Sequence, residues 1–331
     1  MPHAKNIFSN WIKTEEIKKM SKLPISLVID DAGPVNMYHY HVMHEPHDKI
    51  IPPAFALHFG RICQDLGVRG KFSVVPCPAG LGRLDRPTEV NGVDPDHIEA
   101  FTDMVKRYIM PNFSITSEIL THHFAVSLKT LHNTHQCEDT FVRNATPEEI
   151  ADYVSLSLEI LTNMGLNPTG VTSPWQTGLY NEETYAKGIG MAFKRTLKKD
   201  KCFYFLHCWG AINKPVIMFD TPETGNVVSI PCNAPDAFWD SQRPFTYTQA
   251  QTNVKEMIDS LISEDGRTGK LRELFEAGLP LIMLTHWQAL YSDGRGTGIE
   301  GFEYLMKRIN RIFGQTTQWM DFDEIAELTR K

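Results

Sequence analysis

The stretch ISLVIDDAGP, residues 25–34, decides the fold of this chain. Its short apolar, β-branched run over 25–29 predicts a buried strand, and two acids, Asp30 and Asp31, follow directly at the carboxyl end. Like charges held this close oppose each other, so a bound cation would favour the pair. For an isolated pair, the alternative is that one aspartate caps the next turn while the other is solvated.

Further strands also end in polar residues. Helical spacing over 53–66 precedes the strand-like KFSVVP at 71–76, and FSITSEIL at 113–120 leads to Thr121, His122 and His123. Late in the chain, LPLIMLTH ends at His286. This alternation predicts mostly parallel strands, and functional side chains at successive strand ends predict a distorted or incomplete (β/α) barrel.

Helix signals divide the rest of the chain. Thr146, Pro147 and Glu149 form a capping-box start for a helix that should run to Met164. Five more helices are predicted, near 96–109, 181–198, 249–262, 270–277 and 298–314.

Composition restricts the function. The chain has 331 residues, a formal net charge of −7 and scattered rather than clustered basic residues, which argues against nucleic-acid and membrane partners. No apolar run approaches the roughly 20 residues that cross a bilayer. We predict one domain over 1–331, with 1–22 an N-terminal extension, and a cytoplasmic location unless a leader has been removed.

The motif VIDDAGP resembles the first motif of the polysaccharide deacetylases, the NodB-homology carbohydrate esterases, where a strand ends in two aspartates. The resemblance implies a (β/α) barrel of the NodB type. It also implies that Asp30 is the general base and that Asp31 binds a divalent metal, zinc by preference. The resemblance extends over about 25–313.

The second family motif has two histidines separated by three residues. SEILTHHF occupies its place, with His122 as the match, but Val126 stands four residues later. His123 is a candidate for the missing ligand, although adjacent residues of a regular strand point to opposite faces. Other candidates, His39, His41 and His44, lie in a histidine-rich loop where each could equally be solvated.

Two later motifs also resemble the family. GVTSPWQTG, from Gly170, keeps a proline and Trp175 but lacks the arginine that orients the base. LIMLTHW matches the family's L-x-H strand, which implies that His286 is the general acid, with a core histidine as the alternative.

Aromatic and acidic residues are candidates for the substrate pocket. Trp239 and Asp240 in DAFWDSQRP lie where the family has pocket residues, and Trp175 and Trp287 follow strand ends. Each tryptophan could instead be ordinary core.

Three functions compete. The resemblance implies a metal-dependent hydrolase that removes an acetyl or other acyl group from a carbohydrate. The second hypothesis is a non-catalytic carbohydrate-binding relative that has lost part of the metal site. The third, a glycoside hydrolase, requires carboxylates roughly 5 to 9.5 Å apart across a sugar, which vicinal aspartates do not readily supply.

Overall fold

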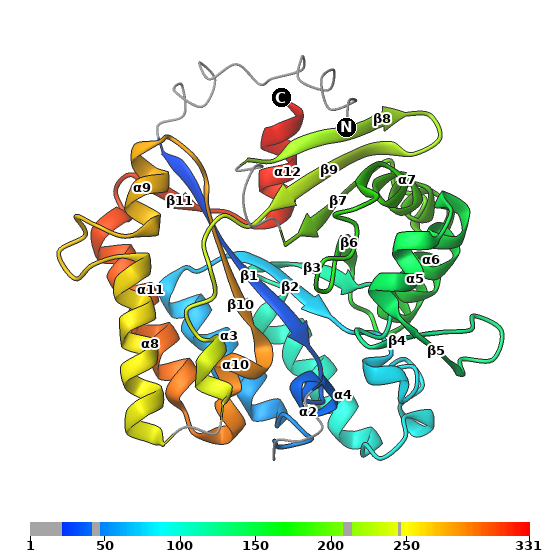
Figure 1. Ribbon diagram of the computed structural model, residues 1–331, viewed down its shortest axis with the longest axis horizontal. Helices are drawn as coiled ribbons and strands as arrows, with labels where there is room; N and C mark the ends of the chain where they lie inside the picture. Colours follow the sequence, from blue (N-terminus) through cyan, green and yellow to red (C-terminus); the bar gives the residue numbers. More distant parts are fainter. Residues whose placement is uncertain (1–21, 42–46, 208–213, 244–245) are drawn as a thin grey trace.

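The computed structural model describes residues 22–41, 47–207, 214–243 and 246–331. Residues 1–21, nearly all of the predicted N-terminal extension, lie outside the described residues, as does His44. In the described ranges, strands alternate with helices (Figure 1).

A nine-stranded sheet forms the centre, and two further strands pair separately. The strands are β1 (Leu23–Ala32), β2 (Gly70–Val74), β3 (Phe113–Glu118), β4 (Phe124–Val126), β5 (Asn133–Cys137), β6 (Pro168–Thr172), β7 (Lys201–Leu206), β8 (Val216–Thr221), β9 (Gly225–Pro231), β10 (Leu281–His286) and β11 (Thr317–Trp319). The order is β10-β1-β2-β3-β6-β7-β9-β8, with β11 beside β1. Every pairing in this sheet is parallel except β8 with β9, which confirms the predicted α/β class.

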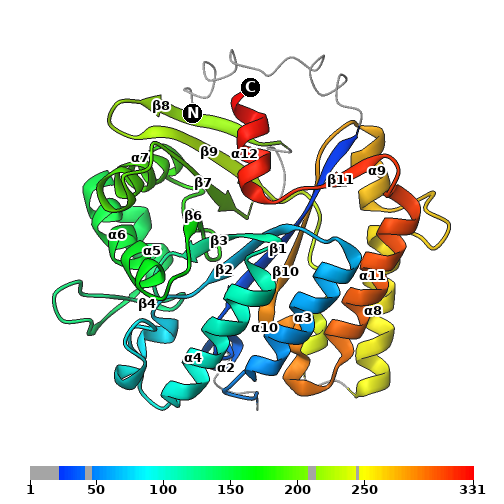
Figure 2. The ribbon, with the colours of Figure 1, turned by 180° about the vertical axis from the view of Figure 1, so that it is seen from behind.

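Helices surround this sheet. They are α2 (Met37–His41), α3 (Pro53–Leu66), α4 (Pro95–Met104), α5 (Glu138–Asn144), α6 (Pro147–Asn163), α7 (Glu182–Ala192), α8 (Tyr247–Leu261), α9 (Lys270–Glu276), α10 (Trp287–Tyr291), α11 (Thr297–Phe313) and α12 (Phe322–Arg330). Seen from both sides, α3, α4, α8 and α11 group together, and α5, α6 and α7 lie beyond β6 (Figures 1 and 2). None of the helices in the described part of the chain has the length and apolar content needed to cross a lipid bilayer.

Strand β1 is the organising element. All of its residues after Leu23 are buried, because β10 and β2 flank it in the sheet and both of its faces are covered. The β1–β10 register places Asp30 opposite His286. The two strand ends that carry the predicted base and acid therefore lie side by side.

The chain after β9 returns to β10. The backbone N–H groups of Asn233 and Ala234 both donate to the carbonyl of Ile282, at 3.1 and 3.2 Å, and Ala234 forms an isolated parallel bridge with Met283. This contact links the β9 side of the sheet to the β10 side by one bridge rather than a ladder. Full barrel closure stays a prediction.

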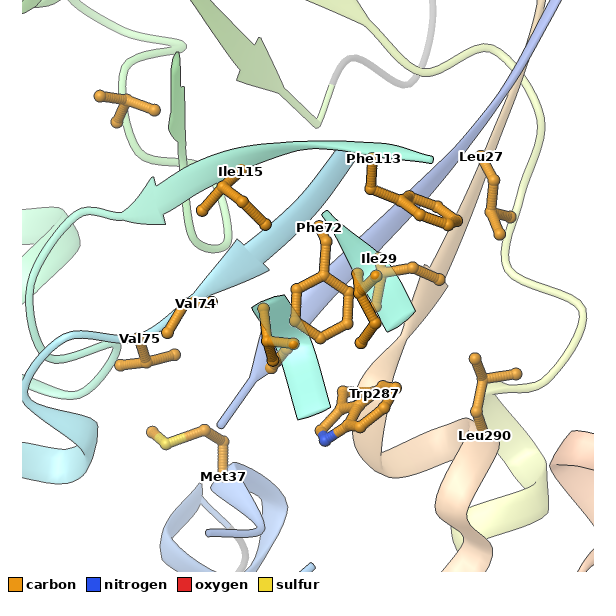
Figure 3. Packing of buried hydrophobic residues seen from close by; sticks show 14 of the residues in the cluster. Leu27, Ile29, Met37, Phe72, Val74, Val75, Phe113, Ile115, Trp287 and Leu290 are labelled. Carbon is orange, nitrogen blue, oxygen red and sulfur yellow. The ribbon is translucent and has the colours of Figure 1, made fainter. Parts of the chain in front are cut away.

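The apolar core between the sheet and α3, α10 and α11 contains Trp287. Its ring lies 4.6 Å from Phe55, 5.5 Å from Phe59 and 5.2 Å from Phe72, measured between centroids. Figure 3 shows it beneath Phe72 and Ile29. The side chain is fully buried, which corrects the expectation that Trp287 lines a substrate pocket. Immediately after β10 the chain turns into α10, and that turn directs the indole into the core.

The predicted capping box is confirmed: the Thr146 hydroxyl accepts from the Glu149 N–H, and Glu149 accepts from the Thr146 N–H. The predicted helix over 181–198 ends instead as a π-helical turn over Phe193–Leu197. Short elements carry the weakest sequence signal, and β4, β5, α5, β11 and α12 were not predicted.

Candidate active site

The carboxyl ends of β1, β3 and β10 place acids and histidines at one end of the sheet. Asp30 and Asp31 directly precede Ala32, the last residue of β1, while Glu118 and His286 are the last residues of β3 and β10. His122 follows β3 by four residues. Parallel neighbouring strands present their carboxyl ends on the same side, so these side chains converge.

Asp31, Glu118 and His122 form the first cluster. The Nε2 atom of His122 lies 2.6 Å from Asp31 Oδ1 and 3.2 Å from Glu118 Oε1. One potential ligand atom from each of the three residues lies within 4.8 Å of the others. All three side chains are buried, so these groups interact with little screening by water.

Hydrogen bonds fix one oxygen of each carboxylate. Glu118 Oε2 accepts the Asp31 N–H at 2.7 Å and the Ser73 hydroxyl, while Asp31 Oδ2 accepts the Gln288 side-chain amide. The other oxygens, Asp31 Oδ1 and Glu118 Oε1, have no hydrogen-bond donor among the described residues. Both unsatisfied oxygens lie next to His122 Nε2.

Two residues of this cluster and one neighbour have strained backbone conformations. Asp31, His122 and Trp175 have φ values of +62°, +50° and +48°, a region that side chains with a Cβ seldom adopt. Such strain persists only where surrounding contacts enforce it, and it gathers at functional sites. At Asp31 it interrupts the regular alternation of the strand.

Glu138, at the start of α5, enforces the turn at His122. Its buried carboxylate accepts the backbone N–H groups of Thr121 and His122, at 2.8 and 2.9 Å, and the Tyr153 hydroxyl at 3.0 Å. The β4–β5 pair thus leads the chain back to the turn, where Glu138, directly after β5, stabilises the strained backbone at His122.

Charges in the first cluster oppose one another. Burial and the neighbouring Asp31 charge raise the pKa of Glu118 well above its usual value. Burial would raise the pKa of Asp31 as well, but the charge of His122 holds it well below the usual range. Burial disfavours protonated His122, yet Asp31 and Glu118 raise its pKa to about 10. Without a metal, a proton on His122 therefore supplies the positive charge beside Asp31 and Glu118.

Asp30, Lys71, His207 and His286 form the second cluster. The buried Lys71 ammonium donates to Asp30 Oδ1 and, at 2.5 Å, to the Thr172 hydroxyl. His207 Nε2 lies 3.1 Å from Asp30 Oδ2. Burial would raise the pKa of Asp30, but Lys71 and His207 lower it below the usual value.

Both histidines of this cluster are oriented through Nδ1. His207 Nδ1 bonds the Ser173 carbonyl at 2.9 Å, and His286 Nδ1 bonds Asp236 Oδ2 at 2.7 Å. Their rings are nearly parallel, with centroids 6.3 Å apart. Burial would lower the pKa of His286, but Asp236 and the Asp31 charge raise it to about 9.

The first cluster fits a divalent metal. Two carboxylates and an imidazole are a ligand set that zinc accepts, and the two oxygens without donors both lie beside His122 Nε2. A cation there would also offset the two buried charges.

The spacing of Glu118 and His122 differs from the ligand spacing that was predicted. Glu118 and His122 are separated by three residues, which is the spacing of the family's histidine pair with glutamate in the first position. The prediction has His122 in the first position, with Val126 where its partner would stand. That position lies in β4, beyond the turn.

The remaining histidine candidates lie around the cluster. His123 belongs to neither candidate ligand group among the described residues, because the turn at His122 directs it towards His41, with the rings stacked 5.9 Å apart. His41 Nε2 bonds the His122 carbonyl at 2.7 Å, and burial lowers the pKa of His41 to about 4. His39 bonds the His47 carbonyl instead.

Two tryptophans contact histidines of the two clusters, one at each cluster. Trp175 is 37% exposed and its ring lies edge-on to His122 at 4.5 Å. Trp239 contacts His286 at 4.6 Å. Asp240 points elsewhere and pairs with Arg243 at 2.9 Å.

Sequence reasoning missed five residues of the site, namely Lys71, Glu118, His207, Asp236 and Gln288. Two of them had a visible signal: Glu118 has the family spacing, and Asp236 stands in the same DAFWD segment as Trp239. Lys71 opens a predicted strand, where a lysine normally indicates a solvated end.

No family model and no curated protein matches the sequence. Solved structures do match the fold. A structure described as a polysaccharide deacetylase from Mycobacterium smegmatis aligns with a TM-score of 0.50 and 13% identity, over 84% of this chain and 78% of that one. A second structure described as a polysaccharide deacetylase, from Pseudomonas aeruginosa PAO1, aligns with a TM-score of 0.50 and 11% identity, over 92% of this chain and 89% of that one.

A third structure, described as a glycoside hydrolase/deacetylase from Parabacteroides distasonis, aligns with a TM-score of 0.50 and 11% identity, over 93% of this chain and 70% of that one. At these identities the likeness concerns the fold and leaves the chemistry to be argued from the site. This chain has the fold of the polysaccharide deacetylases.

Proposed function

We propose that this protein is a metal-dependent hydrolase that removes an acetyl or other acyl group from a carbohydrate-type substrate. One observation carries the proposal: Asp31, Glu118 and His122 converge on one buried point, directly beside Asp30 and His286. The five side chains supply a metal-ligand set, a base and an acid within one site.

In this proposal Asp31, Glu118 and His122 hold the metal, with zinc as the preferred ion. A bound zinc ion supplies Lewis acidity, which activates water and polarises the acyl carbonyl. His122 must then be neutral, so the proton that it holds in the metal-free protein leaves on binding.

Asp30 acts as the general base. Lys71 and His207 keep its carboxylate ionised at neutral pH, so it can accept a proton from the attacking water. Lys71 also fixes Oδ1, which leaves Oδ2 for that proton. The water oxygen forms the new bond to the acyl carbon.

His286 acts as the general acid. Asp236 occupies its Nδ1, which leaves Nε2 as the free ring nitrogen, and a pKa of about 9 keeps the ring protonated at neutral pH. His286 then donates this proton to the leaving nitrogen or oxygen as the bond to the acyl carbon breaks.

Trp175 and Trp239 are proposed to contact the substrate. Each packs against a histidine of one cluster, so a ring-shaped group lying between them would reach both the metal ligands and the acid. Aromatic faces are suited to this contact because they combine a large apolar surface with rigidity.

The test is acetate release from a panel of N-acetylated and O-acetylated sugars. Protein stripped of metal and reloaded with one equivalent of Zn²⁺ should release acetate, and stripped protein should not. Asp30→Asn should abolish the reaction, whereas His58→Ala, at an exposed position of α3, should not change it. If the wild type binds sugars in calorimetry but releases acetate from none, the non-catalytic carbohydrate-binding function replaces this proposal.

A further inference from the structure

A second group of potential metal ligands lies outside the metal site proposed above. Asp30, His207 and His286 each offer one ligand atom, and these atoms lie within 4.8 Å of one another. Two imidazole nitrogens and one carboxylate oxygen are a common ligand set for zinc and other divalent transition metals.

The two histidines are already oriented as metal ligands are. A ligating histidine usually donates its other ring N–H to a carbonyl or carboxylate, which fixes the tautomer and leaves a lone pair for the metal. His207 has the Ser173 carbonyl at Nδ1, and His286 has the Asp236 carboxylate. In both rings Nε2 remains as the ligand atom.

Asp30 supplies an independent observation. Its side chain is fully buried, yet Oδ2 accepts no hydrogen bond from the described residues. His207 Nε2 is only 3.1 Å away, close enough for an ion pair but out of line for a hydrogen bond. Since Lys71 holds Oδ1, the unsatisfied oxygen is the one that faces the histidines.

The balance of charge indicates a weaker site than the first. Four carboxylates with little exposure belong to the two clusters, those of Asp30, Asp31, Glu118 and Asp236, and Lys71 supplies one positive charge. A first divalent cation nearly neutralises the remaining charge. A second one would add net positive charge, so its affinity should be lower.

We propose that Asp30, His207 and His286 bind a second divalent transition-metal ion such as Zn²⁺, more weakly than the first. This site takes the base and the acid of the proposed reaction as ligands. Occupation therefore blocks their proton transfers, and the second ion is an inhibitor rather than a participant.

The test counts bound Zn²⁺ on the full chain after chelator treatment, by isothermal titration calorimetry and by elemental analysis after dialysis. The wild type should bind two equivalents, the second more weakly. His207→Ala should bind only one, and His58→Ala, which also removes a histidine, should still bind two. Asp236→Asn should weaken the second equivalent about 10-fold to 100-fold, because it removes an outer-shell partner. Circular dichroism confirms that each variant folds.

Asp31→Asn separates this proposal from the proposed function. It should lose the tight equivalent and keep the one that His207→Ala abolishes. If a single ion binds and only His207→Ala removes it, the second site is real but the ligand assignment of the proposed hydrolase fails. If His207→Ala and the wild type bind the same number of ions with the same affinities, the second site does not exist.

Discussion

Asp30 and Asp31 are adjacent in the chain, yet their carboxylates lie in opposite electrostatic surroundings. Asp30 meets a buried cation, Lys71, whereas Asp31 faces a second carboxylate, Glu118, with His122 between them. The positive φ of Asp31 separates the two side chains into different clusters. In the proposed function, this one strand end therefore supplies both the general base, Asp30, and a metal ligand, Asp31.

The largest effect is expected in the cluster that contains Asp30, when its proposed general acid, His286, is replaced. His286→Ala should lower turnover about 100-fold to 10,000-fold, the usual loss when a general acid is removed. The tight zinc equivalent should remain, because His286 belongs to the other cluster. Steady-state kinetics with thermal melts provides the measurement, and unchanged turnover with a lower melting temperature would make His286 a structural residue.

Lys71→Met tests whether Asp30 depends on its cation. Removing one partner of a fully buried ion pair should cost about 3–5 kcal/mol of the free energy of unfolding. Urea unfolding of the metal-free protein measures this loss. In the double variant with Asp30→Asn the loss should be smaller than in Lys71→Met alone, since no unpaired charge remains; an equal or larger loss would contradict the pairing.

In the cluster of Asp31, Glu118 and His122, Asp31→Ala should lower the affinity for the first zinc equivalent by more than about 100-fold. Even outer-shell partners of metal ligands typically account for 10-fold to 100-fold. Asp30→Ala should leave this equivalent bound. Elemental analysis at one equivalent of Zn²⁺ distinguishes the two variants, and equal metal content in Asp31→Ala and wild type would refute the assignment of Asp31 as a ligand.

The pH dependence of the free energy of unfolding should show that His122 is protonated in the metal-free protein. His122 and His286 have pKa values of about 10 and 9 in the folded protein, above the ordinary 6.5, so folding favours their protonated forms. Their contribution is fully present below pH 6.5 and is lost as the pH rises to about 10.

Urea unfolding between pH 6 and 10 should therefore show falling stability in the metal-free protein. The slope should be smaller with zinc bound, because His122 is then already deprotonated. His286→Asn should remove the part of the slope that ends near pH 9. A flat profile in the metal-free wild type would mean that neither histidine is protonated as described.

The smallest effect is expected at Asp240. It is partly exposed and pairs with Arg243 on the surface, so Asp240→Asn should change the free energy of unfolding by no more than about 0.5 kcal/mol. It should leave the pKa of His286 unchanged, whereas Asp236→Asn should lower it. Titration of the histidine ring protons by NMR compares the two variants.

The sequence by itself determined the longer strands and helices and the strand ends that carry Asp30, Asp31 and His286. These features are local: apolar runs, helix caps and the residue that directly follows a run. The capping box at Thr146 is an example in which the whole motif lies within four residues.

Only the tertiary structure decided which side chains meet at those ends. Lys71 reaches Asp30 from the neighbouring strand, and Glu118 lies beside His122 because the chain turns sharply at His122. Trp287 turned inward for the same kind of reason, since α10 begins directly after β10. Strand register and positive φ values determine which of these side chains contact one another. Both depend on contacts between distant segments that no local pattern encodes.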